Sequence, residues 1–126
     1  MSLEEPTPAE WKVLGVVWQA GPLAARDVVA RLEADTGWST STIKTLLRRL
    51  VEKGHLETKR VGNSFLYSVT TSPMRALRKA GDALLERAGE ATVGPLLSYL
   101  VKQSRLSDGD LAELRALLDE KREGDA

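Results

Sequence analysis

The sequence lacks cysteine, has a single histidine and contains few aromatic residues, and each shortage excludes a class of protein. Without cysteine, neither a disulfide framework nor a thiolate metal site can form. The one histidine, His55, has no second histidine with which to hold a catalytic metal, so we expect no enzyme, no metal and no cofactor. We expect His55 to be a boundary residue or a phosphate contact. Aromatic residues make up 5% of the chain and hydrophobic residues 42%, so aliphatic side chains must build the core.

Long apolar runs are also missing. No stretch suits a signal peptide or a membrane-spanning helix, so we expect a soluble, cytoplasmic protein without membrane insertion. The 126 residues fit one domain, or one small domain with an appendage. Their formal net charge is zero, yet residues 39–60 carry six basic and two acidic side chains. Because a local basic patch matters more for DNA affinity than the total charge, a nucleic-acid partner is not excluded.

The stretch from Ser39 to Gly54 has the strongest helical pattern. Its apolar residues follow the spacing of one buried helical stripe: Ile43, Leu46, Leu47, Leu50 and Val51. The other face carries hydroxyls in the first turn and cations further along: Thr40, Ser41, Thr42, Lys44, Thr45, Arg48 and Arg49. Short side chains let a helix approach base edges while cations reach phosphates, as in a DNA major groove. The alternative is a core helix with a solvated basic face.

Two helices are predicted before this stretch. Thr7, Pro8 and Glu10 form the sequence signature of a capping box, which predicts a helix that begins there and ends at Gly21-Pro22. A second helix is predicted from Ala25 to Asp35. Joined to the third by a short turn, it predicts a helix-turn-helix arrangement.

The N-terminal part also carries two further expectations. Residues 1–6 are expected to form a short frayed arm. Trp11 and Trp18 stand at helical spacing beside Leu14, so they are interpreted as core residues rather than as aromatics that stack on a ligand.

A β-hairpin is predicted directly after the third helix. Residues 55–61 and 64–69 alternate, and Gly62-Asn63 between them suits a tight turn. A hairpin at this place is a wing, and Arg60, Asn63 and Ser64 near its tip are candidate contacts to the DNA backbone or minor groove. The alternative is an ordinary surface hairpin.

Beyond Thr71 the sequence predicts three amphipathic helices, over Ser72–Gly89, Thr92–Gln103 and from Ser107 onward. The acidic residues Asp108, Asp110 and Glu113 fall at a helix start, where capping explains them better than a cation site. Three short helices cannot bury their leucines by themselves. They must pack against the winged domain or, as the better candidate, against the same segment of a second chain. For the second case we predict an inter-chain core made of Leu84, Leu96, Leu97, Leu100, Leu114 and Leu118.

Together these features predict a mainly α fold with a small β-hairpin wing. Residues 1–71 are expected to form a winged helix-turn-helix DNA-binding domain, and residues 72–126 a C-terminal helical dimerisation segment.

Three segments resemble the penicillinase-repressor family, which includes methicillin-resistance and copper-responsive repressors. They are the opening Thr7-Pro8-Ala9-Glu10-Trp11, the helix Thr42-Ile43-Lys44-Thr45-Leu46-Leu47 with its end at Lys53-Gly54, and Phe65-Leu66-Tyr67-Ser68. The similarity spans residues 6–120. It implies a homodimeric winged-helix repressor that binds a palindromic operator in double-stranded promoter DNA and controls β-lactam-response or related stress genes.

The resemblance further implies a sensor protease that acts on the C-terminal region, but the chain departs from its relatives. Staphylococcal relatives are cut at an Asn-Phe bond in the dimerisation region, whereas the single phenylalanine here is Phe65 in the wing. The paired cysteines of the copper-responsive repressors are absent as well. Two other functions stay open at this point: a winged-helix protein-interaction module, and a small-molecule-responsive regulator.

Overall fold

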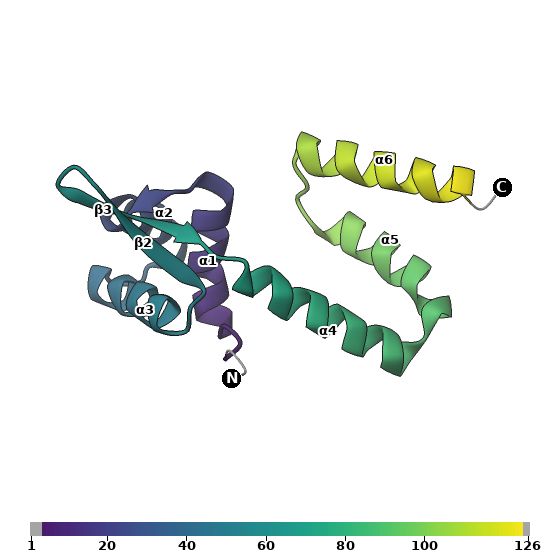
Figure 1. The fold of residues 1–126 in the computed structure, drawn as a ribbon, viewed down its shortest axis with the longest axis horizontal. Coiled ribbons are helices and arrows are strands. Elements are labelled where there is room, and N and C mark those ends of the chain that lie inside the picture. Colours follow the sequence, from purple (N-terminus) through teal and green to yellow (C-terminus); the bar gives the residue numbers. More distant parts are fainter. Residues whose placement is uncertain (1–3, 125–126) are drawn as a thin grey trace. The chain divides into compact units, whose positions relative to one another are not determined.

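The structure is a computed structural model that describes residues 4–124 (Figure 1). In chain order its elements are α1 (Pro8–Ala20), β1 (Leu23–Ala24), α2 (Ala25–Thr36), α3 (Thr40–Glu52), β2 (Leu56–Val61), β3 (Ser64–Val69), α4 (Ser72–Ala88), the 3₁₀ helix η1 (Glu90–Thr92), α5 (Val93–Gln103) and α6 (Asp108–Gly124). This order confirms a mainly helical winged-helix domain followed by C-terminal helices.

The helix ends form where the local sequence predicts them. The Thr7 hydroxyl accepts the Glu10 N–H at 3.2 Å, and the Glu10 carboxylate accepts the Thr7 N–H at 2.8 Å, which completes the capping box of α1. Gly54 follows α3 with a φ of +80°, a conformation that a residue with a Cβ adopts only at a cost. At the start of α6 the Asp110 carboxylate accepts the Ser107 N–H, as capping requires.

A three-stranded antiparallel sheet covers the helices, in the order β1-β3-β2. β2 and β3 form the predicted hairpin in the register Leu56↔Val69 to Val61↔Ser64, and its turn projects away from the helices (Figure 1). The strand β1, in which Leu23 and Ala24 pair with Tyr67 and Leu66, is not predicted by the sequence. Two residues are too few to show an alternating pattern, so only the presence of β3 identifies this strand.

One hydrophobic core lies between α1, α2, α3 and the base of the hairpin. Its buried members in the described residues are aliphatic, as the composition predicts: Val13, Leu14, Val17, Val28, Val29, Leu32, Ile43, Leu46, Leu47, Leu50 and Leu56. Trp11 and Trp38 pack against this core. The expectation for Trp18 was wrong, because its side chain is 44% exposed.

The chain divides into two compact units inside α4, after Gly81. The sequence predicts a boundary before this helix, at Thr71. In the second unit, α5 and α6 contain no buried side chain among the residues that the structure describes. Leucines of both helices are about half exposed, including Leu97 at 49% and Leu118 at 61%.

Candidate nucleic-acid interface

The exposed face of α3 brings together most of the residues predicted to meet DNA. Ser39 caps the helix by accepting the Thr42 N–H at 3.1 Å, which satisfies a backbone donor of the first turn. A shallow hollow of about 510 Å³ on the outer face is lined by Thr40, Ser41, Lys44, Thr45 and Arg48. The hollow therefore combines hydroxyls near the helix N-terminus with two cations one and two turns further on.

Thr42 and Arg49 flank this hollow instead of lining it. Thr42 is exposed, and its hydroxyl accepts a hydrogen bond from the Ser39 hydroxyl at 3.0 Å. Arg49 is exposed in the last turn of α3. Arg48 lies 3.8 Å from the Glu52 carboxylate, but both side chains are about two-thirds exposed, so this pair adds little to stability and leaves Arg48 accessible.

The wing carries the remaining predicted contacts. Arg60, Asn63 and Ser64 are all exposed around the turn, where Gly62 has a φ of +62°. The Arg60 Nε–H donates to the Gly62 carbonyl at 3.2 Å, so the guanidinium is held against the turn. β2 lies against α3, which connects the wing to the helix that carries the hollow.

An ion pair that the sequence analysis missed holds the C-terminal end of α3. The Lys53 Nζ donates to Oε1 of Glu10 at 2.6 Å, and the Glu10 side chain is 1% exposed. Burial alone would raise the pKa of Glu10, but the hydrogen bond and charge of Lys53 and the N–H of Thr7 outweigh it and lower that pKa. Forty-three residues separate the partners, so no local pattern could have revealed the pair.

His55 is not a phosphate contact, because it is buried at 1% exposure. Its Nε2 donates to the Glu4 carbonyl at 2.6 Å, and its Nδ1 accepts from the Ser72 hydroxyl at 2.8 Å. His55 thus ties the N-terminal segment to the start of α4. With Pro6 also buried, the described part of the expected arm, residues 4–6, is attached to the domain rather than frayed; residues 1–3 lie outside the described residues.

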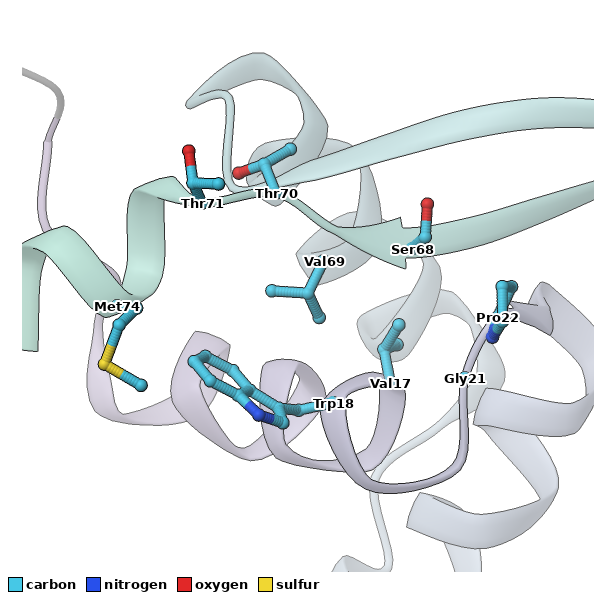
Figure 2. Close-up of a pocket in the computed structure, with 9 residues that line it drawn as sticks. All are labelled: Val17, Trp18, Gly21, Pro22, Ser68, Val69, Thr70, Thr71 and Met74. Carbon is cyan, nitrogen blue, oxygen red and sulfur yellow. The ribbon is translucent and has the colours of Figure 1, made fainter.

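A second hollow lies where α1, β3 and the first turn of α4 meet (Figure 2). It measures about 420 Å³, and Figure 2 shows Trp18, Val69 and Met74 turned toward it. The nine residues that line it carry no ionisable side chain, and the Thr70 hydroxyl is already engaged with the Gly54 carbonyl at 2.7 Å. This hollow therefore offers apolar contacts and no charge with which to hold a polar effector.

The described part of the chain contains neither a metal-binding cluster nor a membrane-spanning helix. Within residues 4–124 no group of three or more His, Asp or Glu side chains is arranged to hold a metal ion. No helix in that range has both the length and the apolar character to cross a bilayer.

Comparison with known proteins places this geometry in a family. The chain matches the penicillinase repressor family over residues 6–120. It belongs to that family. The match confirms the resemblance seen in the sequence, and it makes the chain a DNA-binding transcriptional repressor rather than an enzyme.

Individual relatives of this penicillinase-repressor protein are similar to it over most of its length or over the winged domain. An uncharacterized 16.5 kDa protein of Latilactobacillus sakei is 38% identical over 93% of this chain and 80% of its own length. The methicillin resistance regulatory protein MecI of Staphylococcus aureus is 26% identical over 93% of this chain and 95% of its own. The solution structure of the monomeric form of Bacillus licheniformis BlaI, in complex with the blaP half-operator, is 31% identical with a TM-score of 0.50, and the match covers 54% of this chain and 83% of that chain.

Proposed function

We propose that this chain represses transcription as a homodimer, with the α3 of each subunit in a major groove of a palindromic operator in double-stranded promoter DNA. The observation that carries the proposal is the hollow on α3, because its hydroxyls and cations match base edges and phosphates. The wing residues Arg60, Asn63 and Ser64 are proposed as contacts to the adjacent backbone. That a BlaI relative was solved with a half-operator supports the same mode of binding.

The homodimer is supported by the exposed leucines of the second unit. The exposed fraction is more than one-third for each of Leu84, Leu96, Leu97 and Leu100. In addition, α5 and α6 have no buried side chain within the described residues. Exposed apolar surface of this extent marks a protein–protein interface. A second copy of the same segment would cover it and would join two winged domains. Their α3 helices would have to lie about 34 Å apart to enter successive major grooves.

The structure disfavours the protein-interaction alternative. A docking helix presents apolar anchors at the centre of its interface, whereas the exposed side chains of α3 are all polar or charged. The apolar hollow beside Trp18 offers a small-molecule effector no ionisable group.

The functional hypothesis also includes the location of the protein and the way it is controlled. A repressor acts where the chromosome is, so we place the protein in the cytoplasm. Control of β-lactam-response genes and inactivation by a sensor protease stay predictions from the family resemblance. Because Phe65 lies in the wing, cleavage in the C-terminal region would have to use a bond other than Asn-Phe.

The salt dependence of binding tests the α3 face. We expect Arg48→Ala to weaken binding to every sequence and to flatten the plot of log K against log salt by about one unit, because one phosphate contact releases roughly 0.9 counterions. The measurement is fluorescence anisotropy with a labelled duplex at several salt concentrations. Arg122→Ala, at the far end of α6, is the matched control and should leave the slope unchanged. An unchanged slope in Arg48→Ala would remove Arg48 from the phosphate contacts.

Base reading is tested separately at Thr45, which is half-buried in the wall of the hollow. Thr45→Ala should relax the sequence preference at one position per half-site by about 1–3 kcal/mol and leave non-specific affinity nearly constant. Thr45→Ser keeps the hydroxyl and loses the methyl group, so it separates a hydrogen bond to a base from contact with a thymine methyl. Binding to a set of single-base operator variants measures both. An equal loss of affinity for all sequences would mean that Thr45 only positions α3 against the DNA and does not read a base.

A further inference from the structure

The wing carries an exposed aromatic ring that the interface described above does not use. Phe65 is 56% exposed, near the end of β3 that leads out of the turn. It pairs directly across the hairpin with Arg60, and residues opposite each other in an antiparallel pair project to the same face of the sheet. Phe65 and Arg60 therefore form one surface at the tip of the wing.

The register shows which face this is. Counting by twos along both strands leads from Arg60 and Phe65 through Thr58 and Tyr67 to Leu56 and Val69. Leu56 is buried in the core, and Tyr67 and Val69 pack against it. Phe65 thus continues the core-facing side of the hairpin past the end of the core, on the side where α3 lies against β2.

Val61 provides a natural comparison on the opposite face. It is 52% exposed, nearly as much as Phe65, but it pairs with Ser64 and shares its face with Lys59 and Leu66. The two apolar side chains thus have similar exposure in the same hairpin and differ in the direction in which they project.

We propose that Phe65 is a minor-groove wedge, which inserts at a base step beside the sequence that α3 reads, with Arg60 in the groove next to it. This inference rests on the DNA-binding function proposed above. Phenylalanine is among the apolar residues that partly unstack a base step from the minor groove and bend the duplex. Arginine is attracted to narrow, A·T-rich minor grooves. The hydrogen bond from Arg60 Nε to the Gly62 carbonyl already orients this side chain in the free protein. The wing would then confer a preference for flexible or A·T-rich flanks.

The test uses the full chain and a duplex that the wild type recovers from a random-sequence pool. A 2-aminopurine base is placed in turn at each position that flanks the half-site, because its fluorescence rises when it loses stacking. We expect wild-type protein to raise this fluorescence at one step per flank. Phe65→Ala should abolish the rise and weaken binding about tenfold. This is the net effect of two opposing contributions, the apolar area of the ring that is buried in the groove and the cost of unstacking the bases. Phe65→Leu should retain part of both effects.

Val61→Ala is the matched control and should match the wild type in both measurements. Replacing flanking A·T pairs by I·C pairs should preserve affinity and replacing them by G·C pairs should reduce it, because only guanine places an amino group in the minor groove. Loss of affinity in Phe65→Ala without any wild-type fluorescence rise would overturn the wedge, as would equal behaviour of Phe65→Ala and Val61→Ala. If the wild type recovers no duplex, the DNA-binding function itself fails and the wedge fails with it.

Discussion

Leu97→Asp should convert the proposed repressor dimer into a monomer that has lost most of its operator affinity. Leu97 lies in α5 with 49% of its surface exposed, among leucines that no residue of the described chain buries. If those leucines form the inter-chain core, a carboxylate placed there must be desolvated without a partner, which is costly. Each winged domain would then bind its half-site alone.

The expected loss of affinity is large because the proposed dimer would bind its second half-site intramolecularly. Tethering of this kind raises avidity by about 10²–10⁴-fold without any new contact, and the monomer forfeits that gain. Sedimentation at micromolar concentration measures the assembly, and titration of full and half operators measures the affinity. The variant should keep weak, salt-sensitive binding, because α3 belongs to the other unit and keeps its fold.

Ser98→Asp is the matched control, since it adds the same charge to the same helix away from the stripe of Leu96, Leu97, Leu100 and Val101. It should stay dimeric. A wild-type chain that sediments as a monomer and still binds the whole operator with full affinity would exclude the dimer mechanism.

Lys53→Met should lower the free energy of unfolding by about 3–5 kcal/mol, which is the usual cost of removing one partner from a buried ion pair. The cause is the carboxylate that remains. Glu10 is 1% exposed, and its Oε2 already has no hydrogen-bond partner in the described residues. Without Lys53 the negative charge would be held only by the Thr7 capping contacts. Urea unfolding followed by tryptophan fluorescence, at one fixed protein concentration, measures the change.

Two comparisons separate this effect from lost packing. Adding Glu10→Gln to Lys53→Met removes the stranded charge and should restore much of the lost stability. Glu52→Gln disrupts the exposed Arg48–Glu52 pair and should change the free energy of unfolding by about 0–1 kcal/mol. Equal losses for Lys53→Met and the double variant would show that the charge of Glu10 is not the cause.

The pair also predicts a pH dependence whose sign reverses in the variant. The pKa of Glu10 is lowered in the folded protein, so its contribution to stability is complete above the unfolded pKa of about 4.3 and is lost as pH falls through the folded pKa. In Lys53→Met, burial acts with less opposition and should raise the pKa of Glu10 above the unfolded value. The variant should then gain stability, relative to the wild type, as pH is lowered from 7 toward 4.

Local sequence patterns predicted most of the secondary structure and the exposed side of α3 that carries hydroxyls and cations. The capping box at Thr7, the apolar stripe from Ile43 to Val51 and the Gly62-Asn63 turn each depend on neighbours within a few positions, so each is visible in the sequence. Periodicity alone separates the two faces of α3, which is why Ser41, Lys44 and Arg48 were placed together before the fold was known.

Contacts between distant segments could not be predicted in this way. β1 is only two residues long and exists because β3 is there to pair with it. Trp18 satisfies the helical period of the core but lies beyond its edge, because the width of a buried stripe depends on what packs against it. For His55 the sequence left a boundary residue or a phosphate contact open, and only the folded chain buries it and brings Glu4 and Ser72 to its two ring nitrogens.

The sequence by itself determined the family, the order of the helices and the chemistry of the α3 face, since all three are properties of residue type and local spacing. The tertiary structure alone decided which charges are buried and which apolar groups are not. Glu10 and Lys53 form a pair because packing brings together residues whose separation along the chain carries no signal. The two-residue turn sets Phe65 opposite Arg60, but only the packing of Leu56, Tyr67 and Val69 decides that this face of the hairpin continues the core.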